Sequence, residues 1–154
     1  EHKGLYRQGY ASSPEPNEDY LLPVGEANIV QEGTSLTIVT WGAIVQKSVE
    51  AARNSGCSVE IIDIRTLFPL DMETILTSIQ KTNRVIVAHE DNITGGFGGE
   101  ISARIADEGF EYLDAPVKRI ASKDLPIAYS ENLENSILVQ TSWIEKEILN
   151  LINY

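Results

Sequence analysis

The fold is set by one segment, Val85-Ile86-Val87-Ala88-His89-Glu90-Asp91-Asn92-Ile93-Thr94-Gly95-Gly96-Phe97-Gly98-Gly99-Glu100-Ile101. An apolar run passes through polar residues into four glycines, and isoleucines then recur at helical spacing at positions 101 and 105. This order predicts a strand, a loop and a helix. In a parallel α/β sheet such a loop lies at the carboxyl end of its strand, where these sheets usually bind ligands.

Strands and helices are expected to alternate on both sides of this segment. Apolar and β-branched runs predict strands at 28–31, 36–41, 59–64, 84–88 and 117–121. Helical spacing predicts helices at 44–54, 72–82, 100–108 and 136–152, with Asp71 as an N-terminal cap and Gly109 as a left-handed C-terminal cap. The alternation indicates a three-layer α/β/α sandwich with a mostly parallel sheet.

Residues 1–27 are rich in tyrosine, serine and proline with little periodicity, and they predict an extended arm with turns. The compact domain is expected to cover residues 28–154. With 154 residues the chain is long enough for one domain with a substantial core. It opens with Glu1 instead of methionine, so we expect it to be a piece of a longer protein, with processing of the chain as the alternative.

The composition disfavours nucleic acid and membrane as partners. The net charge of −11 comes from 23 acidic and 12 basic residues, so a nucleic-acid backbone would be repelled and a basic protein attracted. Solubility alone explains the same charge equally well. No apolar run approaches the roughly 18 residues that a membrane span needs. The single Cys57 cannot form an internal disulfide and favours a reducing compartment.

The glycine-rich loop does not carry a dinucleotide-binding motif. Gly96-Phe97-Gly98 supplies the first half of GxGxxG, but Ile101 stands where the third glycine is required. Backbone N–H groups at Gly98-Gly99, before a helix, still suit a small anion. The favoured interpretation is a tight turn that lets the loop and the helix pack closely.

His89 has two interpretations. Beside Glu90 and Asp91 an imidazole titrates near neutral pH and suits proton transfer or a contact at a site. Neighbouring strand residues point to opposite faces, however, and no second histidine stands at a metal-ligand spacing, so metal binding is disfavoured. A structural role in anchoring the loop is preferred. Because Cys57 has no adjacent base and no GxSxG elbow occurs, the sequence offers no self-sufficient catalytic set.

Four runs resemble the C-terminal domain of the transketolase family, and most closely the β subunit of thiamine-diphosphate-dependent 2-oxoacid dehydrogenases, the E1 component. The runs are 37–42, 61–71, His89-Glu90 with 94–101, and 113–117. The His-Glu and Thr-Gly-Gly-Phe loop resembles branched-chain (2-oxoisovalerate) enzymes more than pyruvate enzymes. The resemblance implies a five-stranded sheet with one antiparallel strand, and an arm at 1–27 that arrives from an upstream domain.

The resemblance also implies what this chain does not do. In the family, thiamine diphosphate and Mg²⁺ are bound by other domains, so no catalytic, cofactor-binding or metal residue is assigned here and the chain alone is expected to be inactive. The whole enzyme decarboxylates a branched-chain 2-oxoacid and transfers the acyl group to lipoyl-E2. The implied partners are the E1 α subunit, a second β copy and the basic peripheral subunit-binding domain of E2. The implied location is the bacterial cytoplasm or the mitochondrial matrix of a eukaryote.

Two groups of residues are candidate sites. By position, Asp114 in the Leu-Asp-Ala-Pro motif resembles an acidic group that faces E2, and so does the carboxylate of Tyr154 if that residue is the native C-terminus; a basic domain would complement them. Asp114 has the alternative role of holding the turn before Pro116. The second group comprises loop or interface candidates: His89, Glu90, Thr94, Gly95, Gly96, Phe97, Gly98 and Gly99.

Two other functions stay open at this point. The chain resembles, less closely, a fragment of a transketolase-like or deoxyxylulose-phosphate synthase-like enzyme, in which His89-Glu90 would approach the rim of an active site. From a different class, a free-standing regulatory α/β module would bind a small anion at the loop 95–99.

Overall fold

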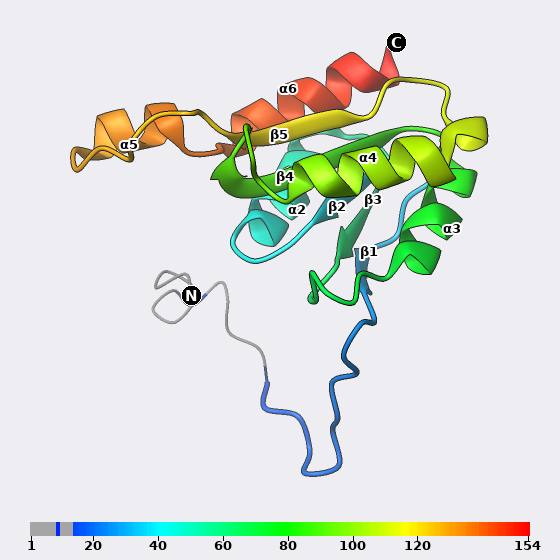
Figure 1. Ribbon diagram of the computed structural model, residues 1–154. Helices are drawn as coiled ribbons and strands as arrows, with labels where there is room; N and C mark the ends of the chain where they lie inside the picture. Colours follow the sequence, from blue (N-terminus) through cyan, green and yellow to red (C-terminus); the bar gives the residue numbers. More distant parts are fainter. Residues whose placement is uncertain (1–8, 10–13) are drawn as a thin grey trace.

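The computed structural model describes residue 9 and residues 14–154, and its centre is a five-stranded sheet (Figure 1). The strands are β1 (Asn28–Gln31), β2 (Leu36–Thr40), β3 (Val59–Asp63), β4 (Val85–Asn92) and β5 (Lys118–Ser122), in the spatial order β1-β3-β2-β4-β5. β1 pairs antiparallel with β3, and the other pairs are parallel. The expected five-stranded sheet with one antiparallel strand is confirmed.

Helices cover both faces of this sheet. One face carries α2 (Ile44–Ser55) and α6 (Thr141–Ile152), and the other carries α3 (Met72–Thr82) and α4 (Gly98–Glu108) (Figure 1). β2 is buried throughout because it lies in the middle of the sheet between both helical layers. Its residues alternate between the two cores: Leu36 and Ile38 face α2 and α6, whereas Val39 faces α3 and α4. The predicted three-layer sandwich is confirmed.

The ends of α3 and α4 test the helix caps that the sequence predicts. Asp71 caps α3, since its Oδ1 accepts a hydrogen bond from the Thr74 N–H at 3.0 Å. Gly109 ends α4 as predicted, but its φ of −118° shows that the left-handed conformation was a wrong expectation. Space is limited there: a Cβ at 109 would lie 2.9 Å from Leu76 Cδ2, between α4 and α3, so the end of the Leu76 side chain would have to shift.

The single helix predicted at 136–152 is two helices, so that boundary was wrong. α5 (Glu131–Ile137) projects from the body of the domain, and α6 begins at Thr141 (Figure 1). Val139 lies between them, fully buried, and its carbonyl accepts a hydrogen bond from Lys47 Nζ at 2.6 Å. A buried extended residue fits the same apolar spacing as a helix, and the periodicity therefore concealed the break.

Two other boundaries lie at the end of β4 and in the N-terminal arm. β4 continues to Asn92, four residues past the predicted end at 88, so His89 and Glu90 belong to the strand. Of the predicted arm at 1–27, residues 14–27 contain no helix or strand, and residues 1–8 and 10–13 lie outside the described residues.

None of the helices in the described part of the chain combines the length and the apolar character required to cross a membrane.

Candidate functional site

The loop that follows β4 is held in place by residues in and after β5. Asp124 accepts two hydrogen bonds from Thr94, from the backbone N–H at 3.0 Å and from the hydroxyl at 2.7 Å. These bonds, the one from the hydroxyl foremost, hold the pKa of Asp124 below its ordinary value and keep the carboxylate charged. The Arg119 guanidinium donates to the Ile93 carbonyl at 2.8 Å. The glycine-rich loop therefore has a defined position at the carboxyl end of β4.

His89 lies beneath this loop and is completely buried. Its ring stacks on Trp41 with 5.3 Å between centroids and 4° between planes, and neither ring nitrogen has a hydrogen-bond partner among the described residues. Burial lowers the pKa of His89, an effect that nearby Arg119 reinforces and Asp91 opposes. The imidazole is therefore neutral, and proton exchange with solvent from this position requires the loop to open.

Two glycines allow the loop to cover the imidazole. A Cβ at Gly98 would collide with Cδ2 and Nε2 of His89, and one at Gly96 would lie 2.6 Å from Cε1. Both positions are buried, so these glycines provide space for a ring. This arrangement fits the interpretation of His89 as a loop anchor; a contact between His89 and a partner stays a prediction.

Part of the loop is open to solvent. Thr94 and Gly95 are exposed, while Glu90, Phe97 and Gly99 are half-buried. A groove of about 630 Å³ adjoins the loop and is lined by Leu67, Phe68, Pro69, Leu70, Phe97, Glu100 and Arg104. Phe68 is 92% exposed, which is unusual for so large an apolar side chain. Phe68 was not among the site residues predicted from the sequence, although it belongs to the run at 61–71 that carries the family resemblance.

Asp114 and Tyr154 lie together on a different part of the surface. Both line a groove of about 640 Å³, together with residues of α4, of the 3₁₀ helix η2 (Phe110–Tyr112) and of the segment before β5: Ser102, Ala103, Ala106, Phe110, Leu113, Ala115, Pro116 and Val117. Tyr154 is 75% exposed and Phe110 is 76% exposed. The Asp114 N–H donates to the Asn83 carbonyl at 2.9 Å, which fixes the backbone while the side chain stays exposed.

The two candidate sites lie at opposite ends of the parallel strands. Asp114 precedes β5, whereas the glycine-rich loop follows β4, which is parallel to β5. The amino ends of parallel strands lie together on one side of the sheet, and their carboxyl ends lie together on the opposite side. The structure therefore brings Asp114 and Tyr154 together and separates both from His89.

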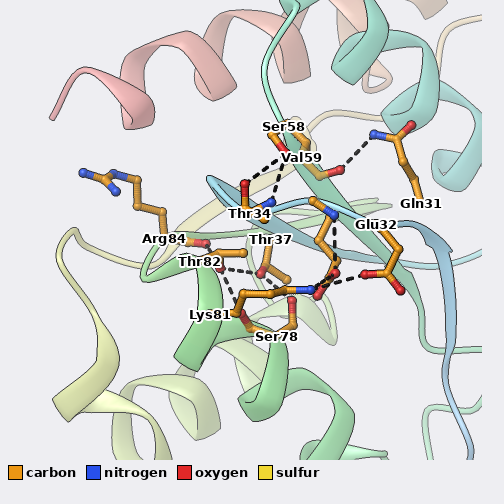
Figure 2. Close-up of polar contacts among 12 residues, drawn as sticks. Gln31, Glu32, Thr34, Thr37, Ser58, Val59, Ser78, Lys81, Thr82 and Arg84 are labelled. Atoms are coloured by element: carbon orange, nitrogen blue, oxygen red, sulfur yellow. Dashed lines mark hydrogen bonds and ion pairs between the residues drawn. The ribbon is translucent and has the colours of Figure 1, made fainter.

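A buried ion pair that the sequence analysis missed joins β3 to α3. Glu60 is 1% exposed and pairs with Lys81, whose ammonium also lies 3.3 Å from a Glu32 carboxylate oxygen (Figure 2). Burial is the largest single influence on the pKa of Glu60 and favours the neutral acid, but the hydrogen bonds from Lys81 and Ser78 and the charge of Lys81 act together against it, so the pKa is lowered. The hydrogen bond with Glu60 raises the pKa of Lys81. Both groups are therefore charged at neutral pH.

Three hydroxyl groups extend this cluster along α3. The Thr37 hydroxyl of β2 lies 2.6 Å from the hydroxyls of both Ser78 and Thr82 (Figure 2). Thr82 is also within hydrogen-bond distance of the Ser78 carbonyl, at 3.1 Å. All three are buried, so the bonds satisfy polar groups that water cannot reach. The cluster attaches α3 to the sheet. Because its members come from separate elements, no fixed spacing in the sequence reveals it.

The described residues do not form a metal site. No group of three or more histidine, cysteine, aspartate and glutamate side chains in that part of the chain is arranged to hold a metal ion. A Mg²⁺-bound diphosphate would need such a donor set, and the residues present do not fit it. The groove at Asp114, the groove at Phe68 and the structured loop form an arrangement suited to protein contacts.

The comparison with known families is decisive at this point. The transketolase C-terminal domain matches residues 25–144. The chain belongs to that family. Among the relatives, the β subunit of pyruvate dehydrogenase E1 from Dictyostelium discoideum is 43% identical over 84% of this chain and 37% of its own length. The β 2 subunit of 2-oxoisovalerate dehydrogenase from Arabidopsis thaliana is 44% identical over 82% of this chain and 36% of its own length.

This transketolase C-terminal domain spans less than half the length of those two relatives. A solved structure described as a split-gene transketolase, an inactive β4 tetramer, has the same fold, with a TM-score of 0.71 and 24% identity over 91% of this chain and 46% of that one. The predicted relationship to E1 β subunits is confirmed. The near-equal identities to pyruvate and 2-oxoisovalerate enzymes do not distinguish the two substrates.

Proposed function

We propose that this chain is the assembly and E2-docking domain of a thiamine-diphosphate-dependent 2-oxoacid dehydrogenase E1 component. The observation that carries the docking role is that Asp114 and Tyr154, selected from the sequence by resemblance, line one groove. The relatives that are E1 β subunits support the enzyme class. In the whole enzyme the domain would lie with an E1 α subunit and a second β copy.

The chemistry of the groove suits a basic partner. Asp114 places an exposed carboxylate beside apolar residues such as Leu113 and Val117, and Tyr154 lies at the same groove. A basic domain would pair its cations with Asp114 and bury apolar groups next to it. The net charge of −11 would increase the rate of encounter with such a partner, and salt would weaken the attraction.

The proposed substrate of the whole enzyme is a branched-chain 2-oxoacid. Its support is the resemblance of the His89-Glu90 loop to that of 2-oxoisovalerate enzymes. The thiamine diphosphate would be bound by other domains, since the described residues lack a suitable donor set. Turnover of 2-oxoisovalerate and pyruvate by the assembled enzyme tests this assignment, and a preference for pyruvate would contradict it. The enzyme would function in the bacterial cytoplasm or the mitochondrial matrix.

The docking role is tested by binding of the peripheral subunit-binding domain of E2. Calorimetry at low salt should give about tenfold weaker binding for Asp114→Asn, because one charge-assisted contact is lost. Asp19→Asn is the matched control, since Asp19 is exposed and lies outside the groove. Equal binding by the unaltered protein and Asp114→Asn, or equal weakening by both variants, would contradict the proposal.

A further inference from the structure

β5 is the edge strand of the sheet on the side of β4. It pairs with β4 alone, as the last strand in the order β1-β3-β2-β4-β5. α6 and α4 lie on either side of β5, which leaves its outer edge without a partner strand in the described residues (Figure 1). An edge strand presents unpaired backbone N–H and C=O groups, to which another extended chain can add.

A basic groove of about 490 Å³ follows this edge. It is lined by Ile93, Arg119, Ile120, Ala121, Ser122, Lys123, Trp143, Lys146, Glu147 and Asn150. Three of these side chains are cationic and one is anionic, whereas the whole chain has 12 basic and 23 acidic residues. The groove is therefore opposite in charge to the molecule that carries it.

The cations are aligned with the strand and the helix beside it. Arg119 is held by its bond to the Ile93 carbonyl, 2.8 Å away, and Lys123 lies 5.3 Å from the centroid of the Trp143 ring. Trp143, Lys146 and Asn150 recur at helical spacing and present one face of α6. No carboxylate of the described residues forms an ion pair with Arg119, Lys123 or Lys146. Lys123 and Lys146 therefore supply positive charge along the unpaired edge, while Arg119 also interacts with the nearby carboxylate of Asp124, whose pKa it lowers.

We infer that this edge groove binds an extended acidic segment of a partner protein, which adds as a strand beside β5. Main-chain hydrogen bonds to β5 would supply orientation, and Arg119, Lys123 and Lys146 would pair with acidic side chains. An apolar residue of the segment would contact Trp143. This partner differs in charge from the basic domain proposed for the groove at Asp114, so the inference goes beyond the proposed function.

Lysines on edge strands also prevent sheets from aggregating. Protection against aggregation requires only that charged side chains lie on the edge strand. Here the cations come from both β5 and α6, Lys123 lies over the ring of Trp143, and the groove that they line is next to unpaired backbone. These features together favour a binding surface.

The test uses a fluorescent eight-residue peptide of alternating glutamate and valine with blocked ends, and anisotropy measured with the 154-residue chain at low and moderate salt. Binding should be weakened by salt and about tenfold weaker for the double variant Lys123→Glu, Lys146→Glu. Arg53→Glu, an exposed cation on α2 outside the groove, should leave binding unchanged. Circular dichroism verifies that each variant is folded.

Three further probes identify the chemistry that is recognised. The same peptide with alternate backbone nitrogens methylated should bind at least about tenfold more weakly, because it cannot pair along a strand edge. Inorganic phosphate and an eight-nucleotide oligothymidylate should compete poorly at equal ionic strength. The proposal is overturned by absent peptide binding at low salt, by equal effects of Arg53→Glu and the double variant, by full binding of the methylated peptide, or by tighter binding of either competitor.

Discussion

The ring of His89 lies between the face of Trp41 and the backbone of Gly98. These two contacts restrict which side chains the positions can accept. A Cβ atom added at Gly98 would overlap the imidazole of His89. The ring cannot move away because it is fully buried. We expect Gly98→Ala to lower the free energy of unfolding by about 2–3 kcal/mol, as overpacking of a core does. Urea denaturation measures this loss.

Gly99→Ala is the adjacent control. A Cβ at 99 would lie 3.3 Å from the flexible end of Arg119, within α4, so the substitution should be neutral or stabilise by up to about 1 kcal/mol. Equal losses at 98 and 99 would show that the first turn of the helix, and not the imidazole, limits both positions. The close approach to His89 would then not explain the glycine.

His89 also makes stability depend on pH. Burial lowers its pKa below the value of about 6.5 for an exposed histidine, so the unfolded chain binds more protons between the two values. Stability should therefore fall as the pH is lowered from 7 to 5.5, by at most about 1.4 kcal/mol per pH unit. His89→Gln, verified as folded, should lose this slope. An unchanged slope, or an NMR titration of the ring near 6.5 in the folded protein, would contradict the assignment.

At the level of elements, α3 is attached to the sheet by charge as well as by its apolar face. Removing the ammonium of Lys81 while keeping its stem, in Lys81→Met, would leave the carboxylate of Glu60 buried and unpaired. Because Lys81 is 40% exposed and water can partly replace it, we expect a loss of about 2–3 kcal/mol, below the range for fully buried pairs. Chemical denaturation at pH 7 measures the change.

Glu32→Gln is the matched control, because Glu32 contacts the same ammonium but is 78% exposed. Its effect should be within about 0.5 kcal/mol. Adding Glu60→Gln to Lys81→Met should restore part of the lost stability, since the unpaired charge is removed. A double variant that is less stable than Lys81→Met would mean that Glu60 has another essential partner.

The elements that sequence predicts best are those whose local signals agree with their surroundings. β2 is apolar and central, and Asp71 caps α3 through its own side chain. The break before α6 was missed because Val139 is buried in an extended segment that keeps the apolar spacing. At Gly109 the close neighbour is Leu76 of another helix, a contact that local sequence does not encode.

The candidate sites divide in the same way. Asp114 and Tyr154 were selected by resemblance to a pattern, and their shared groove depends on how η2 and α6 return to one edge of the sheet. His89 was selected by its neighbours in sequence, whereas its burial depends on Trp41 from another strand-end loop. Lys81, the partner of Glu60, lies 21 residues away in the chain, so no local motif reports the pair.

At the scale of the whole molecule, the described residues form two apolar cores that share one sheet. One core contains Ile144 and lies beneath α2 and α6; the other contains Ile75 and lies beneath α3 and α4. Because β2 contributes side chains to both, loss of either core exposes the strand that supports the other. The domain should therefore unfold as a single cooperative unit.

The two tryptophans report on opposite faces, since Trp41 packs against the core beneath α3 and α4 while Trp143 is on α6. In single-tryptophan variants, Trp41→Phe and Trp143→Phe, fluorescence and circular dichroism should give coincident urea midpoints within each variant. Ile144→Ala and Ile75→Ala should each cost about 2–5 kcal/mol, and each should move both reporters together because the shared strand couples the cores. A Trp143 transition at lower urea than the Trp41 transition, widened by Ile144→Ala alone, would mean that α6 detaches before the sheet unfolds. The surface at Tyr154 and the groove beside β5 would then be presented by an independently mobile helix.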